Sequence, residues 1–227
     1  EAAYVRALVG EGESASSLLE AVNLSLHRLR ASGSIALSAA QAQGVRNALC
    51  EPVSIISGLP GTGKTTSLRV TLSLLQETGV NFLVVAPTGI AAKRVTSLTG
   101  APASTIHRAF KSEGNSDGRR DATYAGIVGD SEGLSGLDGS SEMWGFSPDN
   151  PHPADVVIAD ESSMVDQHLL YRILTCTRPN TRLVFVGDAA QLPSVGPGNV
   201  LRDLIASKLF PTVALTEIFR QVDTSPI

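Results

Sequence analysis

Gly58-Leu-Pro-Gly-Thr-Gly-Lys64-Thr65 is the stretch that decides the fold class of this chain. Its spacing, Gly-x-x-x-x-Gly-Lys-Thr, is typical of a loop that binds phosphates between a strand and a helix. Glycines let the backbone curl around a polyphosphate, so that successive N–H groups point at the anion beside a helix N-terminus. The stretch therefore predicts a site for a nucleoside triphosphate.

The residues around this loop fit the same interpretation. Val53–Ser57 is an apolar run that predicts a buried strand entering the loop, and Leu68, Leu72 and Leu75 have the spacing of a helix leaving it. Lys64 supplies a positive charge for the β and γ phosphates, and the Thr65 hydroxyl is a hard oxygen ligand for Mg²⁺. The expected nucleotide-binding residues of this segment are Gly58, Pro60, Gly61, Thr62, Gly63, Lys64, Thr65 and Thr66.

Composition indicates a globular chain rather than a membrane or nucleic-acid-coating protein. The 227 residues are 42% hydrophobic and 18% charged, enough to bury a sizeable core. No apolar run approaches the roughly 20 residues that span a bilayer, and no signal peptide is evident, so we expect a cytoplasmic protein without membrane contact. The net charge is −4, so any contact with nucleic acid must be local.

The hydrophobic pattern changes along the chain. Residues 1–34 predict a small helical appendage, with an apolar stripe of Leu18, Leu19, Val22, Leu26 and Leu29. Another helix is predicted from Ser38 to Leu49. After Pro52, strands alternate with amphipathic helices, which predicts an α/β fold with a parallel sheet flanked by helices. The expected strands are Val53–Ile56, Phe82–Ala86, Val156–Ala159, Leu183–Val186 and Val213–Leu215, and the helices between them include Ala91–Leu98, Gln167–Leu174 and Val200–Ile205.

Residues 112–153 interrupt this alternation. They are rich in Gly, Ser, Asp and Pro, and predict an irregular, mobile insertion. Trp144 and Phe146 within it could stack on a nucleic-acid base, although an aromatic pair that anchors a loop to the core is the commoner arrangement.

Acidic side chains follow the predicted strand Val156–Ala159. A carboxylate at the end of a buried strand can reach a Mg²⁺ ion held against phosphates, so Asp160 is the expected metal ligand. Glu161 is then placed to orient and deprotonate the attacking water. Gln191, in the loop after Leu183–Val186, could hold that water or contact the γ-phosphate.

Six motifs in this order resemble those of superfamily 1 DNA helicases that move 5′ to 3′, and most closely the RecD-like branch. The resemblance covers about Leu37 to Gln221. The motifs are Gly58–Thr65, Ala86–Arg94, Ser104–Arg108, Asp160–Met164, Gly187–Gly198 and Ile218–Gln221.

The resemblance implies a RecA-like ATPase motor domain over 35–227 and adds residue roles. Gln41 matches the glutamine that reads adenine, which implies ATP, with Mg²⁺, rather than GTP. Arg220 matches an arginine that reaches the γ-phosphate. Thr88 and Thr105 match positions on a single-stranded DNA track, and the full set expected there is Pro87, Thr88, Gly89, Thr105 and His107. A buried core position remains the alternative for His107.

The motifs of a second motor domain are not found before Ile227, so we expect a fragment that binds ATP weakly and turns over little by itself. The full protein would couple ATP hydrolysis to translocation on single-stranded DNA and to unwinding at duplex junctions, with nuclease or repair subunits as possible partners. Two alternatives stay open. One is an RNA-directed or relaxase-associated helicase of the same superfamily, and the other is a non-catalytic module of a repair complex.

Overall fold

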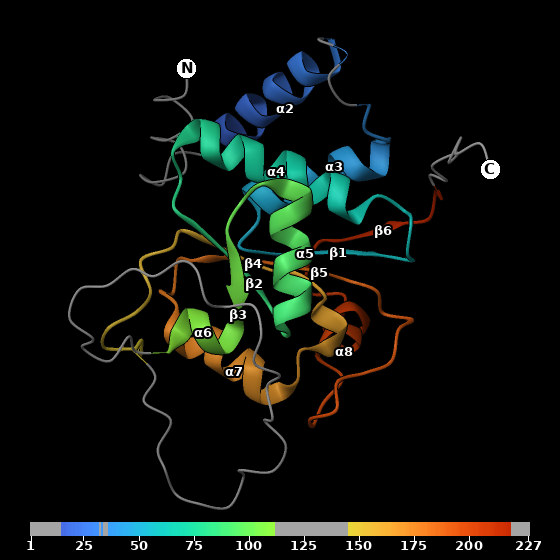
Figure 1. The fold of residues 1–227 in the computed structure, drawn as a ribbon. Coiled ribbons are helices and arrows are strands. Elements are labelled where there is room, and N and C mark those ends of the chain that lie inside the picture. Colours follow the sequence, from blue (N-terminus) through green and yellow to red (C-terminus); the bar gives the residue numbers. More distant parts are fainter. Residues whose placement is uncertain (1–14, 32, 34–35, 112–144, 219–227) are drawn as a thin grey trace, which may run out of the picture.

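The structure is a computed structural model that describes residues 15–31, 33, 36–111 and 145–218 (Figure 1). Helices and strands alternate over most of this length, as the sequence predicts. In chain order the elements are α2 (Ala15–Ala31), α3 (Ala39–Cys50), β1 (Val53–Gly58), α4 (Lys64–Thr78), β2 (Phe82–Ala86), α5 (Gly89–Thr99), β3 (Ala103–Thr105), α6 (Ile106–Phe110), β4 (Val156–Ala159), the 3₁₀ turn η1 (Ser162–Met164), α7 (Gln167–Cys176), β5 (Arg182–Gly187), α8 (Val200–Ser207) and β6 (Thr212–Leu215).

Six strands form one sheet in the order β3-β2-β4-β5-β1-β6, and every neighbouring pair is parallel. The predicted α/β class with a parallel sheet flanked by helices is therefore confirmed. Because all strands run the same way, the loops that follow them lie together at the carboxyl ends of the strands. Strand β1, which leads into the glycine-rich loop, lies between β5 and β6, so this loop begins inside the sheet rather than at its border.

Alternate residues of each strand enter two different cores, one on each face of the sheet. Ile56, Val84 and Val184 pack with α3 and α4 on one face, whereas Ile55, Val85 and Phe185 pack with α6, α7 and α8 on the other. Burial on both faces explains why these strands are continuous apolar runs in the sequence. Figure 1 shows the resulting three layers, with the sheet between two groups of helices.

The first described helix adds an outer layer instead of covering an edge of the sheet. Helix α2 packs against α3, and its buried residues Val22 and Leu26 join the same core as Val45. Helix α3 begins as predicted at Ser38, where a capping box links the Ser38 hydroxyl and the Gln41 amide to each other's backbone N–H groups. No helix in the described ranges is long and apolar enough to cross a membrane.

The strand β3 and the short helix α6 were missed by the sequence patterns. Strand β3 has only three half-buried residues, Ala103 to Thr105, so it lacks the apolar run by which the other strands are recognised. It is nevertheless held in register on β2, with Val84 opposite Ala103 and Ala86 opposite Thr105. Its placement at the edge of the sheet extends the line of strand ends by one more loop.

Part of the predicted insertion lies inside the described residues, and it is irregular as expected. Between Gly145 and Pro153 the chain forms only isolated bridges and turns. Phe146 packs edge-on against His152, with ring centroids 4.7 Å apart. It also packs against the core on the face of the sheet that α6, α7 and α8 cover. For Phe146 the anchoring interpretation is thus confirmed; Trp144 and residues 112–144 lie outside the described part.

The close approach of β1 and β6 leads to a first prediction. A Cβ atom at Gly58 would lie 2.8 Å from the Leu215 carbonyl oxygen and 2.6 Å from the Thr62 hydroxyl. Because the Leu215 backbone cannot turn away, we expect Gly58→Ala to lower the free energy of unfolding by about 1–3 kcal/mol in urea denaturation. Gly89→Ala is the control, since a Cβ there meets nothing within 4 Å. Equal stability of the two variants would contradict the packing argument.

Candidate nucleotide-binding site

A cleft of about 510 Å³ opens at the carboxyl ends of the strands. It is built from the loop after β1, the start of α4, one side of α5, the turn after β4 and the loop after β5. Its lining residues are Pro60, Gly61, Gly63, Lys64, Thr65, Thr66, Arg94, Val95, Leu98, Asp160, Glu161 and Gln191. The structure thus brings together most of the residues predicted for nucleotide binding and hydrolysis.

The glycine-rich loop has the backbone shape that an anion cradle requires. Gly61 and Gly63 have φ of 81° and 85°, the left-handed region that favours glycine, and α4 begins immediately after Gly63. Thr62 is buried beneath the loop, and its hydroxyl donates to the Leu59 carbonyl oxygen at 2.7 Å. This loop therefore faces the cleft with backbone and with Lys64, not with Thr62.

The ammonium group of Lys64 is held against the glycine-rich loop by two carbonyl groups of that loop. Its Nζ donates to the carbonyl oxygens of Gly58 at 2.6 Å and of Leu59 at 3.1 Å. Burial lowers the pKa of Lys64, and the nearby carboxylates of Asp188, Glu161 and Asp160 oppose this effect. Lys64 is thus a cation placed among three carboxylates at the end of the sheet.

The acidic pair stands at the end of β4, two strands away from β1. The backbone N–H of Asp160 donates to the Val85 carbonyl oxygen at 2.9 Å, which fixes the turn against β2. Strand β5 separates β4 from β1, so the backbones of these two strands lie about 10 Å apart. Burial raises the pKa of the Asp160 carboxyl to about 6, and repulsion by Glu161 adds to the rise. Such a shift is common for groups at functional sites.

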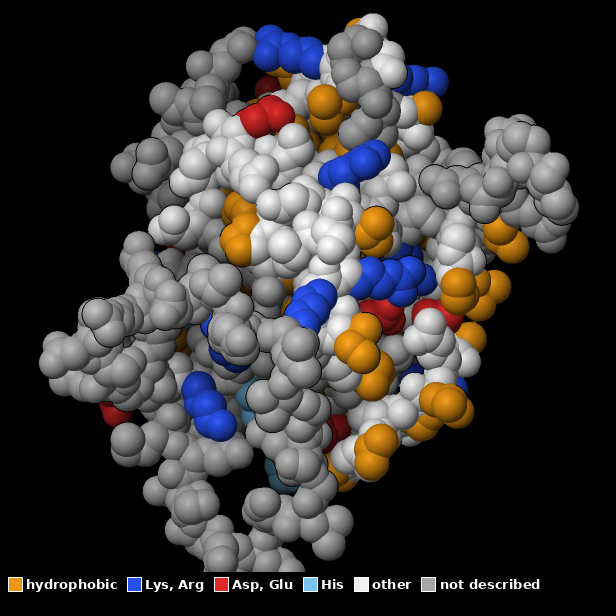
Figure 2. All heavy atoms as spheres, viewed as in Figure 1, with side chains coloured by type: hydrophobic (Ala, Val, Ile, Leu, Met, Phe, Trp, Pro, Cys, Tyr) orange, Lys and Arg blue, Asp and Glu red, His pale blue; other side chains and the backbone are white. Residues whose placement is uncertain are grey.

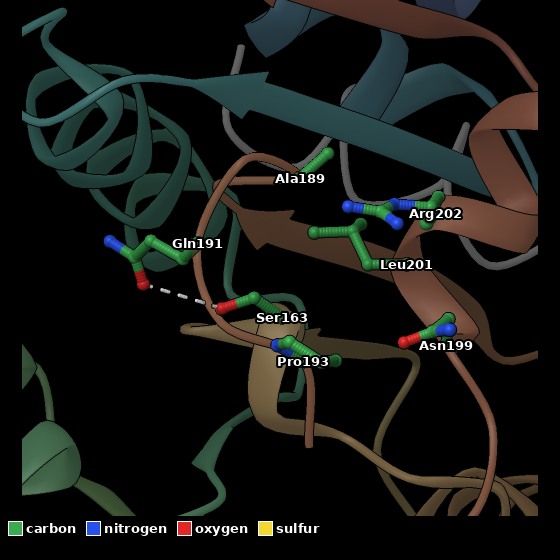
Figure 3. Close-up of a pocket in the computed structure, with 7 residues that line it drawn as sticks. All are labelled: Ser163, Ala189, Gln191, Pro193, Asn199, Leu201 and Arg202. Atoms are coloured by element: carbon green, nitrogen blue, oxygen red, sulfur yellow. Dashed lines mark hydrogen bonds between the residues drawn. The ribbon is translucent and has the colours of Figure 1, made fainter.

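Gln191 joins the main cleft to a much smaller pocket of about 20 Å³ (Figure 3). The Ser163 hydroxyl lies 3.5 Å from the Gln191 amide oxygen, the contact drawn as a dashed line. Figure 3 shows the Gln191 side chain directed away from Asn199 and Leu201. Its exposed amide is therefore part of the wall of the cleft.

Gln41 lies beside the glycine-rich loop but outside the lining of the cleft. Its side chain is only 2% exposed, and its amide nitrogen donates to the Thr62 carbonyl oxygen at 3.4 Å. The amide oxygen accepts from the Ser38 N–H at 2.9 Å. These two contacts use one N–H and one lone pair of the amide, so one N–H and one lone pair remain for a base.

The residues predicted to contact DNA lie at the ends of two adjacent strands. Thr88 follows β2 and Thr105 ends β3, and each hydroxyl oxygen accepts a helix N–H, from Ala91 and Arg108 respectively. Pro87 and Gly89 flank Thr88 in the chain, and neither is buried. His107 is exposed, so the alternative of a core histidine is wrong.

Two charged residues of the site were missed by sequence reasoning. Arg94 lines the cleft from α5, and its Nη1 is 3.6 Å from Oε1 of Glu161. Asp188 is 3% exposed, and its carboxylate accepts the Ala190 N–H at 2.9 Å. Both occur inside motifs that the resemblance rests on, but neither residue type in a loop or helix points to a role by itself. Arg220 lies outside the described residues.

The fold and this cleft define a P-loop nucleoside triphosphatase domain of the RecA-like type. A profile of the AAA domain family matches residues 36–226, and the chain belongs to this family. Its sequence is 31% identical to the ATP-dependent RecD2 DNA helicase of Deinococcus radiodurans over 76% of this chain and 20% of that protein. It is 35% identical to the RecBCD enzyme subunit RecD of Mycobacterium tuberculosis over 73% of this chain and 28% of that protein.

These comparisons confirm the resemblance to RecD-type helicases that the motifs indicate. A crystal structure of the Pif1 helicase from Candida albicans aligns with 82% of this chain and 41% of that chain, with a TM-score of 0.52 and 25% identity. The chain spans between a fifth and a third of the length of the curated relatives named above. The likeness therefore concerns one domain of larger proteins.

The burial of Asp160 leads to a second prediction, on stability. The pKa of Asp160 is about 6 in the folded chain and about 3.9 in the unfolded chain. Above about pH 6 the buried carboxylate therefore disfavours folding by up to about 3 kcal/mol. This penalty fades as the pH falls towards 4. Without nucleotide and in EDTA, Asp160→Asn should raise the free energy of unfolding at about pH 7.5, and raise it less at about pH 5.

Urea denaturation at both pH values measures this difference. The exposed carboxylate of Asp203 on α8 provides the control, because Asp203→Asn removes the same charge without relieving burial. An Asp160→Asn variant that is less stable than the parent at neutral pH would contradict the argument.

Proposed function

We propose that this chain is the first motor domain of an ATP-dependent 5′-to-3′ DNA helicase of the RecD type. The observation that carries the proposal is the convergence of Lys64, Thr65, Asp160, Glu161 and Gln191 on one cleft, at the end of a sheet whose neighbouring strand ends present Thr88 and Thr105. In the whole protein this arrangement would couple ATP hydrolysis to stepping on single-stranded DNA and to unwinding at duplex junctions.

The residues present fit ATP with Mg²⁺. The turn of Gly61 and Gly63 would hold the phosphates by backbone N–H groups, and Lys64 would exchange its loop carbonyls for phosphate oxygens. Thr65 and Asp160, which line the same cleft, would supply hard oxygen ligands for the metal. A Mg²⁺ ion bound by these two side chains would take its other ligands from phosphate and water.

Hydrolysis would divide the acidic pair into two roles. Asp160 serves the cation, whereas Glu161, whose side chain is 23% exposed, can accept a proton from the attacking water. Gln191 stands on the same wall and can orient that water or contact the γ-phosphate. Arg220 is the expected arginine that stabilises charge in the transition state.

The proposed DNA track runs over the ends of β2 and β3. In both Thr88 and Thr105 the hydroxyl oxygen caps a helix, which leaves the hydroxyl hydrogen as a donor to a phosphate of the strand. Exposed His107 offers a ring on which a base can stack. These are short polar contacts, consistent with a chain whose net charge is −4.

We further propose that a second motor domain completes the nucleotide site, that nuclease or repair subunits are possible partners, and that the protein is cytoplasmic. The naming of two relatives as a RecD2 helicase and as a RecBCD subunit supports this. The division into an appendage at residues 1–34 and a motor domain at 35–227 is also a proposal, and the match of the AAA domain profile to residues 36–226 supports it.

Calorimetric titration of this chain with Mg-ATP tests the nucleotide site. We expect weak binding that Lys64→Ala reduces at least about tenfold, since the point charge on the phosphates is lost. Lys208→Ala, an exposed lysine outside the cleft, should bind like the parent. Steady-state ATPase assays with and without single-stranded DNA should show little turnover; robust DNA-stimulated hydrolysis by this chain alone would contradict the need for a second motor domain.

The adenine contact of Gln41 requires a control that separates binding from helix capping. Ser38→Ala and Gln41→Ala each break the same capping box, so both should cost about 1 kcal/mol in stability. Only Gln41→Ala removes the amide. We expect this variant alone to lower the affinity for ATP about fivefold or more, without lowering the affinity for GTP. Titration of each variant with both nucleotides measures this, and parallel losses in the two variants would assign Gln41 to capping only.

A further inference from the structure

One cation of the cleft has no part in the roles proposed above. Arg94 projects from α5, and its guanidinium approaches the Glu161 carboxylate to 3.6 Å. The arginine side chain is 67% exposed, so it stands at the mouth of the cleft rather than inside it. Figure 2 shows basic and acidic side chains next to one another on the face that carries α5, beside a group of exposed hydrophobic side chains.

The backbone at Glu161 forms a tight turn that packs against the end of β5. Glu161 has φ of 52° and ψ of 41°, a left-handed conformation rare for a residue with a side chain. The turn is tied by the Met164 N–H to the Glu161 carbonyl oxygen at 3.0 Å. It also rests on Gly187, where a Cβ would lie 3.1 Å from the backbone nitrogen of Ser162. With the turn held in this way, the direction of the Glu161 carboxylate is set by its pairing with Arg94.

Helix α5 connects that pairing group to the proposed DNA track. The helix begins at Gly89 under the Thr88 cap, and Arg94 lies five residues further on, about 7–8 Å along the axis. Ala91, Ala92 and Val95 are buried against the sheet side, so the helix is held as one rigid piece. A small shift of its first turn would be carried directly to Arg94.

We propose that Arg94 is a positioning residue for Glu161, and that through α5 it makes hydrolysis sensitive to single-stranded DNA on Thr88 and Gly89. The inference rests on the proposed function. A strand bound at the first turn moves or steadies α5, and the Arg94 guanidinium then directs the Glu161 carboxylate towards the attacking water. A pair at 3.6 Å with an exposed arginine is weak and adjustable, so its loss should change rates several-fold rather than abolish hydrolysis.

The competing role for Arg94 is a direct contact with the phosphates, because it lines the same cleft. The two roles differ in what they do to affinity. A phosphate contact would favour ATP over ADP by charge, whereas a residue that acts on Glu161 leaves the ratio of the two affinities unchanged. Binding of both nucleotides by this chain therefore separates the roles without any measurement of turnover.

The test compares Arg94→Gln and Arg94→Lys with Arg69→Gln, a matched change of an exposed arginine on α4 outside the cleft. In the full-length parent protein, ATPase is measured with and without single-stranded DNA. We expect Arg94→Gln to lower the ratio of stimulated to unstimulated turnover three- to tenfold, with the KM for ATP within twofold of the parent. Arg94→Lys should restore part of the ratio, and Arg69→Gln should match the parent.

Three outcomes would overturn the inference. An unchanged ratio in Arg94→Gln would show that the pair does not transmit occupancy of the track. If Arg94→Gln lowered the affinity of this chain for ATP but not for ADP, Arg94 would be assigned to a contact with the phosphates. If the parent hydrolyses ATP but DNA gives no stimulation in any variant, the proposed function itself fails, and the inference with it.

Discussion

The structure depends on the parallel placement of β1 between β5 and β6. This placement brings the glycine-rich loop inside the row of strand ends, one strand from β6 and on the side of the loops after β5 and β4. It is possible only because two glycines remove a Cβ at the crowded ends of the sheet. Gly58 allows β6 to approach β1, and Gly187 allows the turn after Glu161 to rest on the end of β5. The site is thus a consequence of how closely the strand ends pack.

Much of this arrangement is encoded in local pattern. The strands buried on both faces are recognisable because nearly all their residues are apolar, and the loop of Gly58 to Thr65 is recognisable because few backbones can surround phosphates. Strand β3 escaped detection because an edge strand of three residues gains its stability from pairing with β2, which no short window of sequence records. Strand order likewise comes from long-range packing.

The same distinction applies to the site. Lys64, Thr65, Asp160, Glu161 and Gln191 could be assigned because each follows a strand, and all strands of a parallel sheet end together. Arg94 and Asp188 could not, since an arginine within an amphipathic helix and an aspartate within a loop are usually solvated. Gln41 shows the converse. Its motif can be recognised in the sequence, but its contacts with the capping box and with the Thr62 carbonyl oxygen cannot be read from spacing.

The charges of the cleft also explain why nucleotide and metal would have to bind together. Three carboxylates, those of Asp160, Glu161 and Asp188, act on Lys64, while Arg94 is largely exposed at the rim. A triphosphate that entered alone would add several negative charges to a wall that is already acidic, and burial weakens the screening by water. A divalent cation reverses this balance, because it pairs with Asp160 and with the phosphates at once. In the proposed enzyme, the acidity that costs the domain stability would therefore favour a nucleotide that arrives with its metal.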